Sequence, residues 1–340
     1  MLEKSVFTKS EIIEQLKKQY NIIVKKIEIE LRGSANIFYI YDEENIKFVL
    51  KEFESKIDSE NVIKEIQITN HLKDDGLKVP EYIKTVNNTY FFEYKNRIII
   101  LMKFIEGYTK ESNTGTYKQV IESAEIYGKT IKSMEKMKNI DFPEENIEKW
   151  CNGKKLEESK IKIINLLNKC NELIEENNPN KKLYIKIKSD IEFKLSIIEK
   201  IEKIDLSEIK NLTMKNSHGD FSVMQFIYKD EKVVALLDFA KARKMPIVWE
   251  IIRSYTYIDE KCKDSYIDED NLNDYIKKVM EYTDLNEFDL KWMKCFYLMQ
   301  LVTSTFGYKE FFEDNKRTDL LKFGFWRCNM CRCLSEKIRI

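Results

Sequence analysis

The chain has 340 residues, 43% of them hydrophobic, which is enough for a sizeable core and favours two domains or lobes over one. Lysine plus arginine and aspartate plus glutamate both number 58, so the formal net charge is zero and argues against a nucleic-acid partner. The sequence lacks a secretion signal, a run of ~18 apolar residues and evenly spaced cysteines, so we expect a cytoplasmic protein without membrane partners or disulfides.

The first 105 residues alternate between two periodicities. In two segments the apolar residues have the spacing of amphipathic helices. Five other segments have the pattern of β-strands and are rich in β-branched and aromatic residues. Ser10 is the expected N-cap of the first helix. The order predicts a small α+β lobe, an antiparallel five-stranded sheet with one helix between its third and fourth strands. The predicted elements are a helix over 9–20, strands over 23–31, 36–42 and 46–53, a helix over 59–72, and strands over 82–94 and 97–105.

The rest of the chain is mainly helical, with long 3.6-residue periods over 117–138 and 155–203. A β-like interruption at 212–240 contains a predicted hairpin, which turns at Asp230 and Glu231. We therefore predict a two-lobed α+β protein. The predicted division is 1–103 for an N-terminal α+β lobe and 104–340 for a mainly helical C-terminal lobe, with 144–210 as a helical insert.

The strongest local signal is Ser-His-Gly-Asp-Phe at 217–221. Gln225 follows five residues after Asp220, and Asp238 comes at the other end of the predicted hairpin. Two carboxylates with an amide between them are the groups that phosphoryl transfer needs. One carboxylate accepts or orients the hydroxyl proton, while the other carboxylate and the amide oxygen hold Mg²⁺ against the nucleotide phosphates.

This segment resembles the catalytic loop and metal-binding hairpin of the aminoglycoside phosphotransferase and choline kinase family, which is distantly similar to protein kinases. The His-Gly-Asp at 218–220 and the later Asp238 match the family pattern in type and spacing, whereas Gln225 stands where the family usually has Asn. The resemblance implies a protein-kinase-like fold, with Asp220 as the catalytic base and Asp238 and Gln225 as the metal ligands. Glu250, where the family often has Asp, is expected to brace the catalytic loop.

The N-terminal lobe agrees with the same resemblance. Lys51 ends the third predicted strand, where kinase-like folds keep the lysine that pairs with the α- and β-phosphates. Glu65 on the following helix is the expected ion-pair partner, with Glu60 as an alternative. The turn between the first two strands matches the phosphate-covering loop, and 102–107 resembles the hinge that meets the base. The expected cofactor-binding residues are Lys51, Glu65, Gly33, Ser34, Met102, Lys103 and Ile105.

The resemblance implies a small-molecule kinase that uses Mg²⁺ to transfer the γ-phosphate of ATP or GTP to a hydroxyl of its substrate. The acidic segment 259–274 has two interpretations, a solvated loop, which we favour, or a surface that attracts a cationic substrate. The alternative function is a non-catalytic, kinase-like binding or structural protein, such as the spore-coat relatives of the family. Gln225 and the single glycine of the expected phosphate-covering loop give that alternative modest support. The acceptor, the choice of ATP or GTP, and a monomeric or dimeric state stay open.

Three cysteines near the C-terminus follow a C-x-x-C-x-C pattern. A metal site would need a further ligand, and neither histidine has an assigned place beside them. We interpret them as cysteines of a terminal helix or tail. They are Cys328, Cys331 and Cys333.

Overall fold

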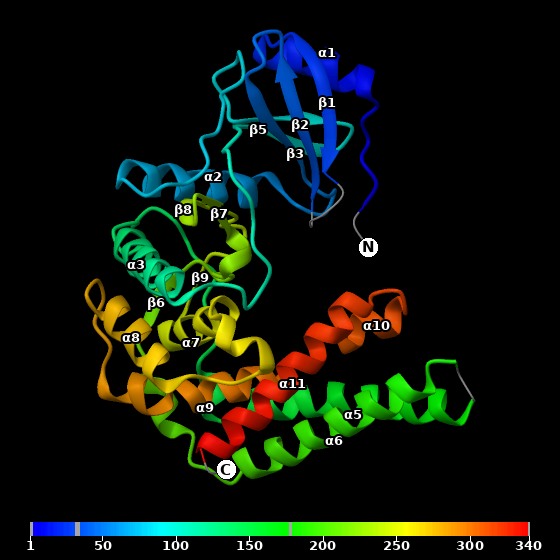
Figure 1. Cartoon of the computed structure of the whole chain (residues 1–340), viewed down its shortest axis with the longest axis vertical. Helices are drawn as coiled ribbons and strands as arrows, with labels where there is room; N and C mark the ends of the chain where they lie inside the picture. The colour runs from blue at the N-terminus through cyan, green and yellow to red at the C-terminus, as the bar shows by residue number, and fades with distance from the viewer. Residues whose placement is uncertain (1–2, 31–34, 177–178, 339–340) are drawn as a thin grey trace. The chain divides into compact units, whose positions relative to one another are not determined.

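The computed structural model describes residues 3–30, 35–176 and 179–338, and the chain folds as two compact units (Figure 1). The polypeptide passes between the units several times, so each unit is made of separate stretches. The hairpin around residue 230 belongs to the first unit, although it follows a long run of second-unit residues. The first unit comprises 1–110, 133–141 and 224–242, and the second unit comprises 111–132, 142–223 and 243–340.

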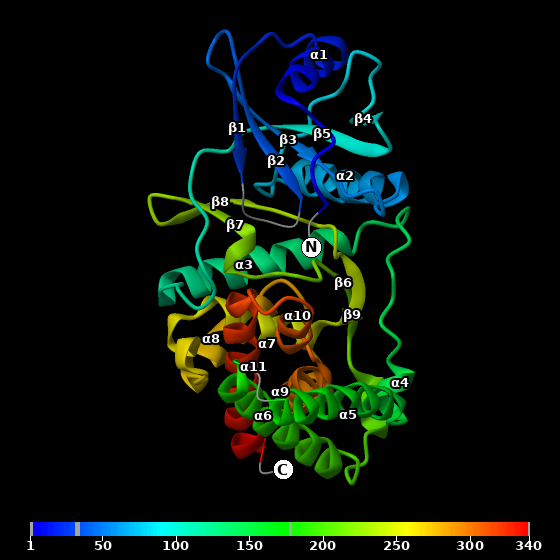
Figure 2. The same cartoon turned by 90° about the vertical axis from the view of Figure 1, so that its right-hand side faces the viewer.

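The first unit is built on a five-stranded antiparallel sheet (Figures 1 and 2). Its strand order is β1-β2-β3-β5-β4, and α2 lies between β3 and β4 in the sequence, which confirms the predicted α+β arrangement. A separate hairpin is formed by β7 and β8. The bounds are α1 Lys9–Tyr20, β1 Val24–Glu30, β2 Asn36–Asp42, β3 Lys47–Glu52, α2 Ser59–Asp74, β4 Phe91–Tyr94, β5 Arg97–Lys103, β7 Phe226–Lys229 and β8 Lys232–Leu236.

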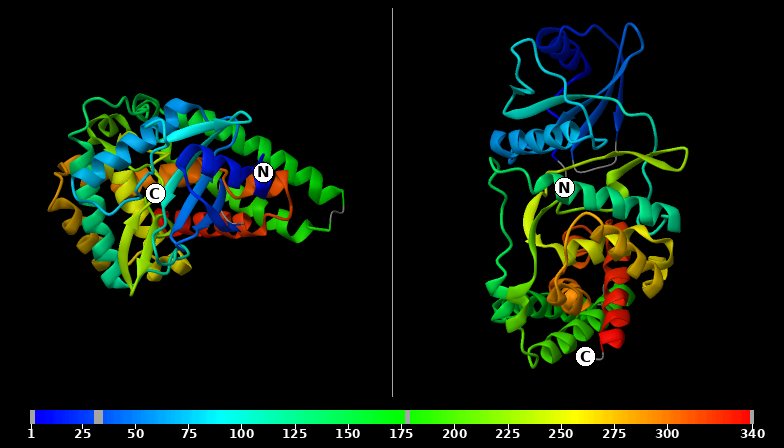
Figure 3. Two further views of the ribbon diagram at one scale, coloured as in Figure 1. Left: turned by 90° about the horizontal axis from the view of Figure 1, so that it is seen from above. Right: turned by 90° about the vertical axis from the view of Figure 1, so that its left-hand side faces the viewer.

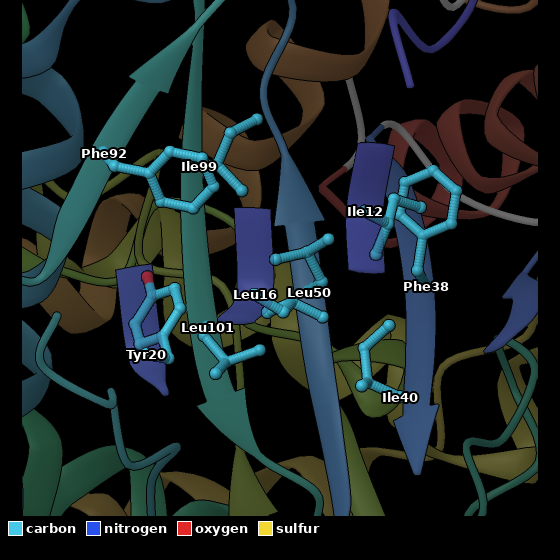
Figure 4. Close-up of a cluster of buried hydrophobic side chains, with 9 residues drawn as sticks. All are labelled: Ile12, Leu16, Tyr20, Phe38, Ile40, Leu50, Phe92, Ile99 and Leu101. Atoms are coloured by element: carbon cyan, nitrogen blue, oxygen red, sulfur yellow. The ribbon is translucent and has the colours of Figure 1, made fainter. Parts of the chain in front are cut away.

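Helices cover both faces of this sheet, and β5 shows why its sequence is apolar at consecutive positions. Successive side chains of a strand point to opposite faces. Ile99 and Leu101 therefore pack with Leu16 of α1 (Figure 4), while Ile98 and Ile100 join the core on the α2 side. A strand that is buried on both faces loses the polar alternation of a half-exposed strand.

Two predicted details of the first unit are wrong. The N-cap of α1 is Thr8 rather than Ser10, because Thr8 forms a capping box with Glu11 at the N3 position. The predicted strand over 82–94 is a strand only in its last four residues. The preceding segment turns instead, since the N–H of Thr85 donates to the carbonyl of Thr89 at 2.7 Å and Asn88 has a left-handed φ of 62°.

The second unit is mainly helical, as its sequence predicts. Helices α5 and α6 lie side by side (Figures 2 and 3), and both pack on α9. A short two-stranded ladder of β6 and β9 leads into α7. The remaining elements are α3 Tyr117–Met134, α4 Glu148–Cys151, α5 Lys154–Glu175, α6 Lys181–Ile201, η1 Ser207–Asn211, β6 Met214–Ser217, η2 Val223–Gln225, β9 Arg243–Pro246, α7 Ile247–Ile258, η3 Glu260–Asp264, α8 Glu269–Met280, α9 Glu287–Thr303, α10 Tyr308–Glu313 and α11 Thr318–Ile338.

Among the described residues, no helix combines the length and apolar character that crossing a membrane requires.

The packing of α1 on the sheet gives a stability prediction. Leu16 is 0% exposed in the core of Figure 4, whereas Ile13 on the same helix is 43% exposed. We expect Leu16→Ala to lower the free energy of unfolding by about 2–5 kcal/mol, because it removes buried methyl groups and leaves a cavity. The matched control Ile13→Ala is expected to change it by about 0.5 kcal/mol or less. Urea unfolding measures both, and equal losses would contradict the packing described.

Candidate functional site

Lys51 lies on the face of the sheet that α2 covers. It pairs in register with Ile100 of β5, whose side chain belongs to the α2-side core, while its neighbour Leu50 belongs to the core under α1. Glu65 reaches Lys51 from α2, and its Oε1 lies 3.3 Å from the Lys51 Nζ. The Lys51 and Glu65 side chains are only 15% and 6% exposed. The structure thus brings these two predicted residues together as a mostly buried ion pair.

Tyr82 connects this ion pair to Asp238. Burial raises the pKa of Tyr82 well above its ordinary value, and the nearby carboxylates of Glu65 and Asp238 raise it further. Both carboxylates therefore lie within electrostatic reach of one phenol. Glu65, which pairs with Lys51, and Asp238, which is far from it in sequence, thus both act on Tyr82 within the first unit.

The hairpin of β7 and β8 fixes the backbone on either side of Asp238. Its two turn residues, Asp230 and Glu231, both have positive φ angles of 50° and 59°, as a tight two-residue hairpin requires. At the open end of the hairpin, the N–H of Leu237 donates to the carbonyl of Gln225 at 2.8 Å. Asp238 follows with a φ of 62°, a left-handed conformation that aspartate tolerates better than most residues. Gln225 and Asp238 are therefore held next to each other along the backbone.

The donor set at this end of the hairpin suits a hard cation. Asp238 offers carboxylate oxygens and Gln225 an amide oxygen, which are ligand types that Mg²⁺ prefers. Over 3–30, 35–176 and 179–338, no group of three or more His, Cys, Asp or Glu could hold a metal ion. Mg²⁺ usually takes one or two carboxylates and completes its shell with phosphates and water. Asp238 and Gln225 are thus residues of the described chain that could each contribute an oxygen ligand to such a cation.

The predicted hinge leaves β5 in an ordered path. The N–H of Lys103 donates to the carbonyl of Glu81 at 2.9 Å, while the exposed side chains of the same two residues pair at 2.5 Å. Met102 and Ile105 are half-buried beside it. The side chain of Lys103 is thus engaged on the surface, and the backbone N–H groups of Lys103 and Phe104 both donate to carbonyls of the protein. The predicted Gly33 and Ser34 lie outside the described residues.

Gly107 lets the hinge approach the hairpin. Its neighbour Tyr108 exchanges two backbone hydrogen bonds with Tyr228 of β7, at 2.9 and 2.8 Å. A Cβ on Gly107 would lie 2.4 Å from the Tyr228 carbonyl oxygen and 2.5 Å from a methyl carbon of Ile227. A glycine is therefore required where the hinge joins the strand that leads from Gln225.

Asp220 belongs to the second unit, in the loop after β6, whereas the other described site candidates belong to the first unit. His218 is completely buried, and its Nδ1 accepts the backbone N–H of Asp220 at 3.3 Å. Glu250 on α7 accepts the N–H of Phe221 at 3.1 Å. This bond is the kind of brace that the sequence predicts for Glu250. Burial raises the pKa of Glu250, against an opposing effect of His218.

Sequence reasoning missed Arg253, which forms an ion pair with Asp220. Arg253 follows Glu250 by three residues on α7, so the two side chains share a face of the helix. That spacing was the sequence feature that could have pointed to Arg253. Its ion-pair partner Asp220 could not be derived from the sequence, because the loop and the helix meet only in the folded unit.

The acidic segment 259–274 is partly used inside the second unit. Asp259 is buried and accepts from the Asn271 amide at 3.0 Å. Asp268 caps α8, and Glu269 accepts from two lysines at 2.6 and 2.8 Å. These three acids have structural partners, which favours the interpretation as an ordinary inter-helix segment. The cysteines at 328, 331 and 333 lie on α11.

The sequence matches no protein-family model, and no curated protein matches it. Solved structures of small-molecule kinases do resemble it. The AMP-bound complex of a spectinomycin phosphotransferase has a TM-score of 0.63 at 14% identity, covering 96% of this chain and 97% of that one. The choline kinase from Cryptosporidium parvum Iowa II has a TM-score of 0.61 at 14% identity, and the match covers 98% of this chain and 96% of that one. An aminoglycoside phosphotransferase from Alicyclobacillus acidocaldarius has a TM-score of 0.61 at 13% identity, and the match covers 99% of this chain and 98% of that one. The predicted fold is confirmed.

The contact of Gly107 with β7 can be tested by adding a single methyl group. We expect Gly107→Ala to lower the free energy of unfolding by about 2–4 kcal/mol, from backbone strain and overlap together. Gly76→Ala is the control, because Gly76 has a φ of 86° but no atom within 4 Å of an added Cβ. It should show the strain alone, about 1–2 kcal/mol. Equal losses in denaturant unfolding would contradict the close approach of Gly107 to Tyr228.

The raised pKa of Glu250 predicts a pH dependence of stability. The folded state keeps the proton of Glu250 to a higher pH than the unfolded chain, whose pKa is near 4.5. The stability that this proton contributes is therefore complete below pH 4.5 and is lost as the pH rises through the folded pKa. We expect the Tm of the wild type, relative to Glu250→Gln, to fall as the pH rises above 4.5. A Tm difference that grows with pH would show that Glu250 is stabilised as a carboxylate.

Proposed function

We propose that this chain, which has the protein-kinase-like fold of the small-molecule kinases, is itself a kinase that transfers the γ-phosphate of ATP or GTP to a hydroxyl of a small substrate. The observation that carries the proposal is the buried Lys51–Glu65 ion pair beside Asp238 in the first unit. The fold alone supports no activity, because one fold hosts many functions. A lysine with an orienting carboxylate, together with a second acid next to an amide, is a set of groups suited to binding nucleotide phosphates.

In the proposed site, Lys51 contacts the α- and β-phosphates through its ammonium group, and Glu65 holds that group in place. Asp238 and Gln225 would hold Mg²⁺ through their side-chain oxygens. When bound, Mg²⁺ supplies positive charge that neutralises the phosphate oxygens during transfer. The backbone of the hinge segment 102–107 would meet the base of the nucleotide beyond Phe104, because the N–H groups of Lys103 and Phe104 already donate to Glu81 and Lys47.

Asp220 is the proposed base of the second unit. Its carboxylate would accept or orient the proton of the attacking hydroxyl, while Glu250 and His218 hold the loop by its backbone. Catalysis of this kind is mainly positioning and charge neutralisation.

The acceptor of the proposed reaction is a small molecule with a hydroxyl group. Attraction of a cationic acceptor would depend on Glu260, Asp264 and Asp270, which are the exposed acids of the segment 259–274. Asp259, Asp268 and Glu269 are already engaged by protein groups.

The rival proposal is a non-catalytic protein with this fold. The specific observation in its favour is Gln225, which is one methylene longer than the asparagine expected beside such an aspartate. The longer side chain shifts the amide oxygen and would weaken one metal ligand. A protein of this kind would bind a ligand or a partner without turnover.

Nucleotide binding and phosphate transfer separate the two proposals. Thermal-shift titrations with ATP and GTP, with and without Mg²⁺, come first, followed by a transfer assay over a panel of hydroxyl-bearing metabolites and antibiotics. We expect Asp220→Asn to lower kcat by about 10²–10⁴-fold and to leave nucleotide affinity unchanged. Lys51→Met should weaken nucleotide binding, whereas Lys25→Met on the exposed strand β1 should not. Absence of both binding and transfer in the wild type would favour the rival.

A further inference from the structure

We propose that Arg253 is a positioning residue that holds the carboxylate of Asp220 in its working orientation. The inference rests on the proposed kinase function and adds a residue to the same site. Arg253 contacts the base rather than the phosphates, so its effect is exerted through Asp220.

The first observation is that one face of α7 is directed at the loop of Asp220. Glu250 accepts the N–H of Phe221 at 3.1 Å. One turn later, Nη1 of Arg253 lies 3.4 Å from the carbonyl oxygen of Phe221, and Nη2 forms the ion pair with Oδ1 of Asp220. The same helix thus holds the loop backbone on both sides of Phe221 and the side chain of Asp220.

The second observation is that the guanidinium group is itself fixed. Its Cζ lies 4.5 Å from the ring centroid of Tyr257, which is buried. Tyr257 in turn packs against Phe323 and Trp326 of α11, with ring centroids 5.5 and 5.4 Å apart. A planar guanidinium that stacks on a ring and bonds a carboxylate in its plane has little rotational freedom. Arg253 is therefore a rigid support for Asp220.

The third observation is the difference in exposure between the two partners. The side chain of Arg253 is 16% exposed, while that of Asp220 is 38% exposed. A carboxylate that is open to solvent to this extent can adopt several rotamers unless a partner selects one. Because a reacting group displaced by about 1 Å can lower the rate roughly 10²-fold, selection of the rotamer is a catalytic requirement rather than a stability device.

The second unit offers a matched control for Arg253. Arg332 on α11 forms an ion pair with Asp190 at 2.8 Å, and its guanidinium stacks on Phe193 at 4.1 Å. It has the same combination of carboxylate and ring, but it contacts neither Asp220 nor its loop in any interaction described here. The burial of the two pairs is reversed, since Arg332 is 37% exposed and Asp190 only 7%. The comparison therefore controls for the loss of an arginine that pairs with a carboxylate and contacts a ring, away from Asp220.

The experiment compares four variants of the full chain: Arg253→Met, Arg253→Lys, Arg332→Met and Asp220→Ala, together with the double variant Asp220→Ala/Arg253→Met. We expect Arg253→Met to lower kcat roughly 10²-fold while the KM for the nucleotide stays within about twofold. Arg253→Lys should recover part of this loss, because lysine restores the charge but not the planar contact. Arg332→Met should keep kcat within about twofold, whatever its own loss of Tm, because Arg332 pairs with Asp190 rather than with Asp220.

A double-mutant cycle that is read from Tm values tests the contact between Arg253 and Asp220 without any turnover. If Arg253 holds Asp220, the Tm loss of the double variant should differ from the sum of the two single losses by about 2–4 °C. Additive losses would overturn the inference, as would a kcat for Arg253→Met close to that of the wild type or equal to that of Arg332→Met. A wild type that neither binds nucleotide nor transfers phosphate would count against the proposed kinase, and the Tm comparison would still decide whether Arg253 holds Asp220.

Discussion

The first unit depends on one buried ion pair, which joins the sheet to the helix that follows it. Lys51 cannot point elsewhere, because the register of β3 with β5 places Leu50 toward α1 and Lys51 toward α2. An ammonium group in that position needs a nearby negative charge, since an unpaired buried charge is strongly destabilising. Glu65 supplies the charge only if α2 lies against the sheet, where Val62 and Ile66 pack. The core and the ion pair therefore require the same helix position.

The hairpin of β7 and β8 extends this constraint to a second set of groups. Its two-residue turn fixes the pairing of the strands, and the pairing places Gln225 and Leu237 opposite each other at the open end. The N–H of Leu236 donates to the carbonyl of Lys78 at 2.9 Å, so the hairpin is also bonded to the segment that follows α2. These backbone hydrogen bonds hold the segment of Asp238, whose carboxylate acts on Tyr82 as that of Glu65 does.

Local signals in the sequence predicted what local physics determines. The period of the apolar residues gave all five strands of the sheet and α2, and the Asp230-Glu231 turn gave the hairpin. The segment before β4 was mispredicted because its apolar residues suggested a strand, whereas Asn88 adopts a left-handed conformation and the chain turns between Thr85 and Thr89. Arg253 was missed for a different reason. Its partner Asp220 is 33 residues away, and no local pattern encodes a contact between a helix and a loop that only tertiary folding brings together.

The placement of Arg253 also affects the free-energy cost of burying the carboxylate of Glu250. A carboxyl buried to 1% exposure would be expensive as an anion, and burial raises its pKa accordingly. His218 and Arg253 both act in the opposite direction, so the face of α7 that meets the loop contains acidic and basic groups one helical turn apart. A change at Arg253 would therefore alter the charge balance around Glu250 as well as the rotamer of Asp220.

Each unit of this chain arranges its own share of the proposed chemistry through contacts within that unit. The first unit contains Asp238 and the ion pair of Lys51 with Glu65. The second unit contains Asp220 with Arg253 and Glu250.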